Sequence, residues 1–177
     1  STLSFTIETT PPTIAITSSA SSLKAGETTT VTFTLSEAAS DFIEDDISVS
    51  GGELSDFAAS SSTVYTATFT PTSDSTTDGV ISVASSKFSD SAGNENADGS
   101  DSNNTLTLSV DTVRPTIAIT SGASSLKAGE TTTVTFTLSE AATDFVEDDI
   151  SVSGGSLSSF SGSGTTYTAT FTPTADS

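Results

Sequence analysis

The sequence predicts an all-β fold built from tandem β-sandwich modules, and three observations lead to this prediction. A long stretch of the chain occurs twice, apolar residues alternate with Thr and Ser along it, and short turns such as KAGE, SGG and TTDG interrupt the alternation. A period of two is typical of strands that bury one face, and Gly, Ser and Asp favour turns. No stretch shows a competing helical pattern.

The repeat has the length of a whole domain. TIAITSSASSLKAGETTTVTFTLSEAASDF begins at Thr13, and TIAITSGASSLKAGETTTVTFTLSEAATDF begins at Thr116, 103 residues later. Such a period indicates tandem modules rather than a solenoid of small repeats. We therefore assign residues 1–10 to the last strand and linker of a preceding repeat. Residues 11–111 form a complete repeat, and residues 112–177 a second repeat that is truncated before its last two strands.

About seven strands are expected in the complete repeat. Their predicted bounds are Thr13–Ser18, Thr28–Leu35, Asp46–Val49, Glu53–Phe57, Val64–Thr70, Gly79–Ala84 and Thr105–Val110. About seven short strands in roughly 100 residues fit an immunoglobulin-like Greek-key sandwich. The stretch Thr2–Ile7 matches the last of these strands and is predicted to be the last strand of the preceding repeat.

Two of the predicted strands show which residues should face the core. In TVTFTLS these are Val31, Phe33 and Leu35, and in VYTATFT they are Tyr65, Ala67 and Phe69. Successive side chains of a strand point to opposite faces of the sheet, so each set lies on one face.

Charge and composition exclude several classes of function. The chain has 23 Asp and Glu residues against four Lys and Arg, a net charge of −19, which argues against binding to nucleic acids or anionic membranes. Cys and His are absent, which excludes thiolate and imidazole metal sites, Cys nucleophiles and Ser-His-Asp triads. Oxygen ligands for calcium or magnesium remain. The sequence contains no 18-residue apolar run, so we expect no insertion into a membrane.

The acidic residues gather in particular loops. SEAASDFIEDD at residues 36–46 returns as SEAATDFVEDD at residues 139–149. In an immunoglobulin-like topology, this loop and the loop at residues 88–104 lie at the pole where the chain enters, beside the linker ETTPP or DTVRP. The loop PTSDSTTDG lies at the opposite pole, near where the chain leaves. Each junction is thus predicted to gather carboxylates from two modules and the linker.

Crowded carboxylates repel one another unless a cation lies between them. Two unit charges about 4 Å apart repel by roughly 4 kcal/mol at an effective dielectric constant of about 20, so several pairs would rival the stability of a domain. Calcium takes about six to eight oxygen ligands, which these loops can supply. The candidate metal ligands are Glu8, Glu37, Asp41, Glu44, Asp45, Asp46, Asp74, Asp78, Asp90, Asn94, Asn96, Asp98, Asp111, Glu140, Asp144, Glu147, Asp148 and Asp149.

Other interpretations of the same residues stay open at this point. Acidic loops commonly form solvated surfaces that keep a protein soluble, and Asp46 could simply begin the next strand. The run N-x-N-x-D-G from Asn94 to Gly99 resembles the start of an EF-hand loop, but it lacks the first Asp, the final Glu and flanking helices. Paired carboxylates can hydrolyse glycosides, yet no Trp or His is present and the acids lie at a pole, so we expect no enzyme.

Several motifs together resemble a known family. These are D-T-V-R-P, L-K-A-G-E-T, T-F-T-L-S-E-A and F-S-D-S-A-G-N. They are similar to the bacterial Ig-like extender repeats of giant RTX adhesins, which include biofilm adhesins and an ice-binding adhesin of a cold marine bacterium. The resemblance covers the whole chain. It implies calcium ligands at Asp90, Asn94, Asp111, Glu140, Asp144 and Glu147–Asp149. Glu8 stands where Asp111 stands in the second linker, and Pro11 replaces Arg114.

The resemblance implies a structural role at the bacterial cell surface. We expect a spacer module that is secreted by a type I route as part of a larger protein. Several calcium ions per repeat would stiffen the contacts between neighbouring repeats. The alternative is a module that binds a glycan or protein through loops such as FAASSSTVY and FSGSGTTY. The truncated repeat should also expose a sheet edge with which another chain could pair.

Overall fold

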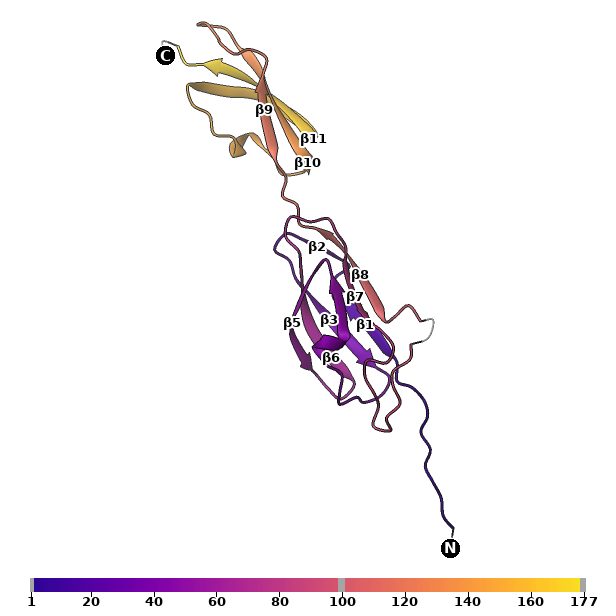
Figure 1. Cartoon of the computed structure of the whole chain (residues 1–177). Coiled ribbons are helices and arrows are strands. Elements are labelled where there is room, and N and C mark those ends of the chain that lie inside the picture. Colours follow the sequence, from indigo (N-terminus) through magenta and orange to yellow (C-terminus); the bar gives the residue numbers. More distant parts are fainter. Residues whose placement is uncertain (1, 99–100, 176–177) are drawn as a thin grey trace. The chain divides into compact units, whose positions relative to one another are not determined.

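The computed structural model describes residues 2–98 and 101–175. The chain divides into two compact units, Ser1–Arg114 (unit 1) and Pro115–Ser177 (unit 2) (Figure 1). In the described residues the regular structure consists of strands and two short 3-10 turns. The predicted all-β sandwich fold is therefore confirmed. No helix in these residues is long and apolar enough to cross a membrane.

Unit 1 is a sandwich of two four-stranded sheets. One sheet has the order β1-β3-β6-β5 and the other the order β2-β8-β7-β4. Neighbouring strands are antiparallel except for β2 and β8, which run parallel. The strands are β1 (Ile14–Ser18), β2 (Ser22–Lys24), β3 (Thr29–Leu35), β4 (Ile47–Ser50), β5 (Gly52–Ala59), β6 (Val64–Pro71), β7 (Gly79–Val83) and β8 (Thr105–Asp111). All seven predicted strands are present, each within two residues of its predicted bounds.

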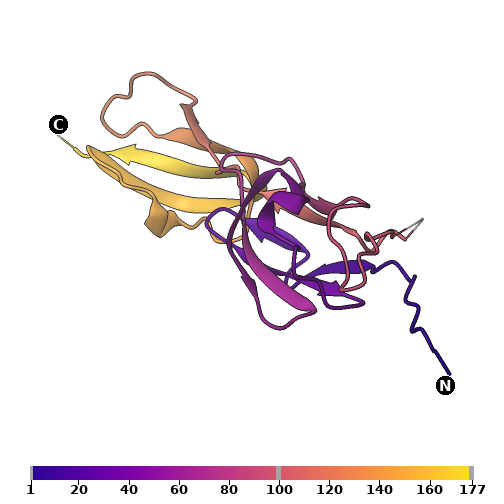
Figure 2. The same cartoon turned by 60° about the horizontal axis from the view of Figure 1, so that its bottom comes forward.

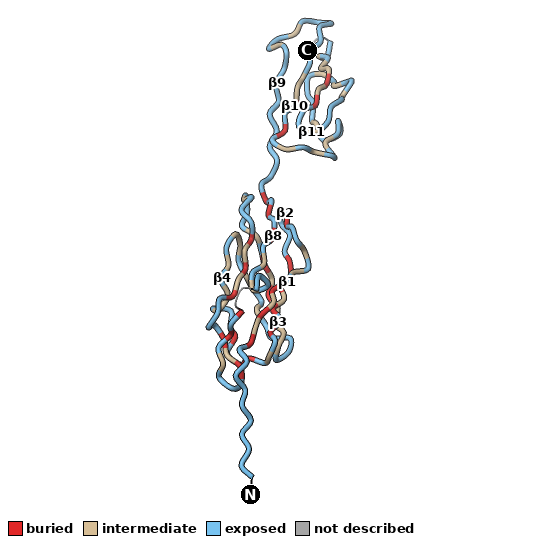
Figure 3. The backbone as a smooth tube through the Cα atoms, turned by 90° about the vertical axis from the view of Figure 1, so that its right-hand side faces the viewer, coloured by how far each residue is buried: buried red, intermediate tan, exposed pale blue. Residues whose placement is uncertain are grey.

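The core of unit 1 is formed by residues of both sheets. Figure 3 marks the buried stretches along the backbone. The residues predicted to face the core on β3 and β6 are confirmed, since Val31, Phe33 and Phe69 have no exposed surface. Two glycines make room for the Phe69 ring. A Cβ atom added at Gly52 or Gly79 would lie 2.5 Å from Phe69 Cζ, so a side chain at either position would displace the ring.

An aromatic cluster attaches the acidic loop to this core. The Phe42 ring lies 5.1 Å from Tyr65, 5.2 Å from Phe88 and 5.6 Å from Phe57, measured between ring centroids, in edge-to-face geometry. The Tyr65 hydroxyl donates a hydrogen bond of 2.9 Å to the Ala39 carbonyl oxygen. The loop between β3 and β4 is thus fixed to the core at two points.

The structure corrects two details of the predicted strands. Asp46 does not begin a strand, because Glu44–Asp46 forms a 3-10 turn (η1) and β4 starts at Ile47. The Asp46 carboxylate accepts a hydrogen bond of 3.0 Å from the Ile43 N–H and thereby closes the turn. The short strand β2 was not predicted. Only Leu23 of its three residues is buried, which leaves no alternation to detect.

The stretch Thr2–Ile7 forms no strand in the structure, in contrast to the prediction (Figures 1 and 2). Leu3, Phe5 and Ile7 remain 78%, 77% and 80% exposed. A strand requires hydrogen bonds to a neighbouring strand, and no described residue pairs with this stretch. Its assignment to a preceding repeat stays a prediction.

Unit 2 contains a three-stranded sheet of order β11-β10-β9. The strands are β9 (Ile117–Ser121), β10 (Thr132–Ala142) and β11 (Gly155–Pro173), and a 3-10 turn (η2) spans Glu147–Asp149. Its buried core consists of Phe136, Leu138, Tyr167 and Ala169. Ile117 and Ile119 are 47% and 60% exposed, whereas their counterparts Ile14 and Ile16 in unit 1 are 1% and 5% exposed.

Candidate metal centre

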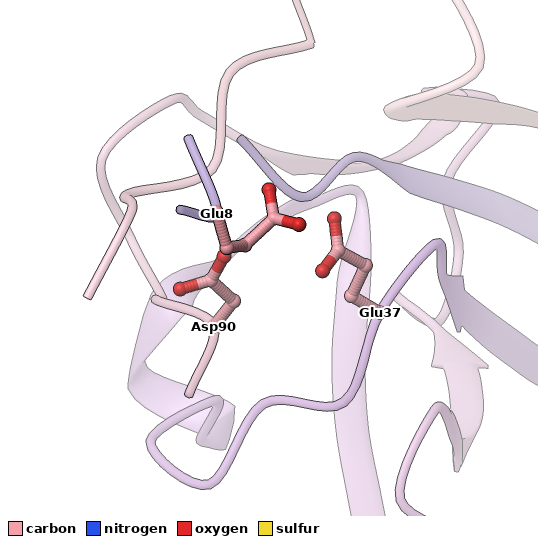
Figure 4. Close-up of side chains that lie close together, drawn as sticks. All are labelled: Glu8, Glu37 and Asp90. Carbon is pink, nitrogen blue, oxygen red and sulfur yellow. The ribbon is translucent and has the colours of Figure 1, made fainter. Parts of the chain in front are cut away.

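Three carboxylates from distant parts of unit 1 meet beside the start of β1. Glu8 comes from the entering segment, Glu37 from the loop after β3, and Asp90 from the loop between β7 and β8. One carboxylate oxygen of each lies within 4.8 Å of the others. Figure 4 shows the three side chains side by side. An isolated bridge between Ala39 and Asp90 holds two of the three segments together. We call Glu8, Glu37 and Asp90 the acid cluster.

Asp90 is the most firmly held member of the acid cluster. It is 8% exposed, and its Oδ1 accepts hydrogen bonds of 2.8 Å from the N–H groups of Ala92 and Asn94. Its Oδ2 accepts a bond of 2.8 Å from the Asn94 side chain. These bonds, that of the Asn94 side chain first, hold the pKa of Asp90 below its ordinary value of 3.8, although burial acts in the opposite direction. Asp90 is therefore a fixed carboxylate that stays ionised.

Asn94 also connects the acid cluster to the entering segment. Its Nδ2 lies 3.4 Å from the Glu8 carbonyl oxygen. Glu8 is fixed locally as well, because its Oε1 accepts a hydrogen bond of 2.6 Å from the Thr10 N–H. The predicted ligands Asn94, Asp90 and Glu8 are thus brought together.

Asp41 supports the same region without joining the acid cluster. Its carboxylate accepts bonds of 3.0 and 3.1 Å from the Ser89 N–H and one of 2.5 Å from the Ser89 hydroxyl. Partial desolvation raises the pKa of Asp41, but the bonds from Ser89 together outweigh it, and the pKa lies below the ordinary value of 3.8. Because Ser89 precedes Asp90, this contact fixes the loop that carries Asp90.

The lowered pKa of Asp41 predicts a pH-dependent contribution to stability. A carboxyl whose pKa is lower in the folded state stabilises the fold above its unfolded pKa, and the contribution is lost as the pH falls through the folded pKa. Because Asp41 is exposed and water screens its charge, Asp41→Asn should cost less than about 1 kcal/mol at neutral pH. The difference from the wild type should shrink below about pH 4. Urea unfolding of unit 1 at several pH values, followed by NMR, measures this.

The matched control is Asp144→Asn in unit 2. Asp144 is the counterpart of Asp41, is exposed, and accepts no hydrogen bond from the described residues. This substitution should leave stability unchanged at every pH. If the loss of unfolding free energy for Asp41→Asn stays constant down to pH 2, the contribution of the Asp41–Ser89 contact does not depend on the charge of the carboxylate.

The carboxylate oxygens of the acid cluster are suitable ligands for a hard divalent cation. Among the described residues, none donates a hydrogen bond to the Glu37 carboxylate, and its counterpart Glu140 has a buried Oε1 without a partner. A buried, unpaired polar atom costs free energy, so such an oxygen favours a cation beside it. Carboxylate and carbonyl oxygens are the ligands that calcium prefers, and no Cys or His is present to favour zinc.

Asn96 and Asp98 have a different place in unit 1. Both are buried, with 1% and 4% of their surface exposed. Asp98 accepts a hydrogen bond of 2.7 Å from the Ile14 N–H and one of 3.2 Å from the Asn96 side chain. Asn96 Oδ1 in turn accepts bonds from the N–H groups of Lys87 and Phe88. These predicted ligands hold the β7–β8 loop against β1 and do not lie in the acid cluster.

The remaining acids of the two repeated loops do not converge. Glu44, Asp45, Glu147 and Asp148 are exposed on the two 3-10 turns. Asp149 accepts a hydrogen bond of 2.9 Å from the Val146 N–H, as Asp46 does from Ile43. In the described residues, only Glu8, Glu37 and Asp90 form a group of acids that could hold one ion.

The other predicted ligands lie where the chain leaves unit 1. Asp74 lines a surface cavity of about 360 Å³ together with Glu27, Thr112 and Arg114. Asp78 is exposed. Asp111 ends β8, and its Oδ1 accepts a hydrogen bond of 3.3 Å from the Val113 N–H.

Two residues that sequence reasoning did not select have specific contacts in unit 1. Ser89 pairs with Asp41, and Thr112, which is 3% exposed, bonds to the loop after β6. The S-D pair in FSDSAGN places Ser89 beside Asp90. Asp41, the hydrogen-bond partner of Ser89, lies 48 residues away along the chain. Thr112 stands directly after the linker acid in D-T-V-R-P, as Thr9 does in E-T-T-P-P, and this repeated position is the one signal that could have found it.

Comparisons with known proteins agree with this fold. A family model described as a bacterial Ig-like domain matches residues 8–107 and again residues 111–177. No curated protein matches the chain. Among solved structures, the chain is similar to the Escherichia coli adhesin FdeC, with 17% identity and a TM-score of 0.50. The match covers 92% of this chain and 56% of that one, and at this identity the likeness concerns the fold alone.

Proposed function

Because the chain belongs to the bacterial Ig-like domain family, we propose that it is a structural spacer segment of a larger cell-surface adhesin, of the RTX extender type. Each unit is a folded block in a series, and calcium at the entry side stiffens the connection to the linker. The role is mechanical rather than enzymatic. The protein would be extracellular, and its neighbours would be further repeats of the same chain.

The observation that carries this proposal is the acid cluster. Glu8 belongs to the linker segment, whereas Glu37 and Asp90 belong to the folded body of unit 1. Without a cation, the negative charges push the linker away from the body. With a cation between them, the same carboxylates tie the linker to it. Cation binding would therefore convert a flexible connection into a stiff one.

The three carboxylates would hold the ion, and the surrounding residues would keep them in place. Calcium supplies positive charge and accepts about six to eight oxygens, so carbonyl groups or water would complete its shell. Asn94 orients Asp90 through the bond to Oδ2. Asp41 fixes the preceding residue, Ser89.

The counterparts of the acid cluster extend the proposal to the second repeat. Asp111 and Glu140 stand 103 residues after Glu8 and Glu37. The buried, unpaired oxygen of Glu140 supports a role for this residue in cation binding. We therefore propose several calcium ions along a series of such repeats, with one beside each linker.

Small-angle scattering tests the spacer role. The maximum dimension of the chain should increase in millimolar calcium relative to chelator, because the linker then bends less. Asp111→Asn combined with Glu140→Gln should abolish most of this increase. Glu147→Gln combined with Asp148→Asn removes the same charge from exposed positions and should leave the increase intact. Equal dimensions of the wild type in calcium and in chelator would contradict the stiffening role.

Binding of a glycan or a protein is the second candidate function. The cavity of about 360 Å³ beside Arg114 supports it, since its lining offers one guanidinium, two carboxylates and several hydroxyls. Among the described residues, no aromatic side chain lines this cavity, and such side chains usually anchor strong binding. A glycan array with the purified chain tests this candidate, and a specific, saturable signal that Arg114→Ala removes would favour it.

A further inference from the structure

Unit 1 contains one linker segment that enters it and one that leaves it, so both ends of a linker can be compared within a single folded body. Glu8 in the entering linker E-T-T-P-P and Asp111 in the leaving linker D-T-V-R-P are counterparts. The position that follows the acid is Thr in both linkers, and Thr112 is the example at the leaving end.

The leaving linker is attached to unit 1 by uncharged hydrogen bonds. Thr112 Oγ1 donates a bond of 2.6 Å to the Thr72 carbonyl oxygen and accepts one of 2.9 Å from the Ser75 N–H. The Thr112 N–H donates a further bond of 2.9 Å to the Ser75 carbonyl oxygen. Thr112 is 3% exposed, whereas the next residue, Val113, is 41% exposed.

The preceding residue adds a second attachment. Asp111 is the last residue of β8 and pairs with Lys24 in the parallel ladder between β2 and β8. Strand pairing and the Thr112 bonds together hold two successive linker residues on the folded body. None of these contacts requires a cation or depends on the charge of a side chain.

From this geometry we infer that Thr112 is a positioning residue that fixes the direction in which the chain leaves unit 1, without a metal ion. The two neighbouring linker positions then act on different modules. The Thr binds the linker to the module before it, and the acid, as Glu8 shows, binds it to the module after it through the acid cluster. This division rests on the proposed spacer function. It predicts that calcium controls only one of the two ends of each linker.

Backbone order parameters from ¹⁵N relaxation test the inference on the whole chain. In the wild type, residues 111–113 should be as rigid as β8 both in calcium and in chelator, with order parameters of about 0.85. Thr112→Val keeps the shape of the side chain but removes the hydroxyl. It should lower the values for residues 112–114 to about 0.6 or less in both conditions. Thr112→Ser keeps the hydroxyl and should restore them.

The control is Thr76→Val, which removes an exposed hydroxyl from the same loop region and should change nothing. Chemical shifts of β3 and β6 report whether unit 1 stays folded. If Thr112→Val unfolds unit 1, the inference is tested by two other sets of order parameters for residues 111–113. These are the values of the wild type in chelator and the values of Thr112→Ser. Flexible residues 111–113 in the wild type without calcium, or unchanged rigidity in a folded Thr112→Val, would overturn the inference.

The same spectra separate this inference from the proposed function. Calcium should shift and rigidify residues 8–10, whereas residues 111–113 should be equally rigid with and without calcium. If residues 8–10 do not respond to calcium, the proposed calcium site fails, and the result for Thr112 still decides the inference about the leaving end.

Discussion

Phe42→Ala should lower the free energy of unfolding of unit 1 by about 3 to 5 kcal/mol, the usual cost of deleting a buried Phe ring. Phe42 is 3% exposed and contacts four aromatic rings, among them Phe33 at 5.9 Å and Phe88 at 5.2 Å. A typical domain is stable by only about 5 to 15 kcal/mol, so this loss is a large fraction of the total. The same ring fixes the loop that carries Glu37, so the calcium affinity proposed for the acid cluster should fall as well.

Urea unfolding followed by NMR measures this effect, because two linked units need not unfold in a single transition. The matched control is Ile43→Ala, one residue further along and 53% exposed, which should change stability by about 0.5 kcal/mol or less. Phe145→Ala makes the equivalent change in unit 2. Phe145 is only half-buried, so its loss should cost unit 2 less. Equal losses for Phe42→Ala and Ile43→Ala would show that the cluster does not hold the loop.

The strands could be predicted because their pattern is local. Val31, Phe33 and Leu35 alternate with Thr, and burial of one face of a sheet follows directly from this alternation. The short strand β2 could not be predicted in the same way. Its pairing with β8 joins Leu23 to Val110, which lie far apart along the chain, and three residues carry too little pattern.

The acid cluster could be predicted only as a region. The sequence pointed to the loop at residues 36–46 and to Asp90, and the structure places Glu37 of that loop beside Asp90. Which acid of a loop points toward the others depends on contacts that are distant in sequence. Asp41 turns to Ser89, and Asp46 turns back to the Ile43 N–H of its own 3-10 turn.

The EF-hand-like spacing of Asn94, Asn96 and Asp98 shows the same limit of a motif. The three side chains recur at every second residue, as in a calcium loop, yet two of them are buried and hydrogen-bonded to backbone groups. A motif gives the type and spacing of residues. Its function follows only from the partners that the fold supplies.

Glu37→Gln should change the stability of unit 1 in opposite directions with and without calcium. In chelator, the substitution removes one of the repelling charges of the acid cluster, so the variant should melt at or above the temperature of the wild type. If the acid cluster binds calcium as proposed, the wild type should gain about 2.7 kcal/mol when the ion is present at about 100 times its dissociation constant. This corresponds to a rise in melting temperature of roughly 10 to 20 °C for a domain of about 100 residues. The variant should lose most of this rise.

Glu44→Gln is the control for the opposite effects predicted for Glu37→Gln in calcium and in chelator. Glu44 belongs to the same loop and carries the same charge, but it is exposed on η1 and lies outside the acid cluster. Its variant should follow the wild type in both conditions. Calorimetry on the same proteins should show one calcium ion fewer for Glu37→Gln, or a much weaker one, and an unchanged number for Glu44→Gln.

The opposite effects of Glu37→Gln with and without calcium distinguish a specific site from a general effect of charge. If calcium only screens the net charge of −19, then Glu37→Gln and Glu44→Gln should respond alike, because each removes one charge from the same loop. A site formed by Glu8, Glu37 and Asp90 instead requires that the two variants differ. Equal melting curves for both variants in calcium and in chelator would therefore refute the acid cluster as the calcium site. A difference confined to Glu37→Gln would locate the ion at the connection between the entering linker and the folded body.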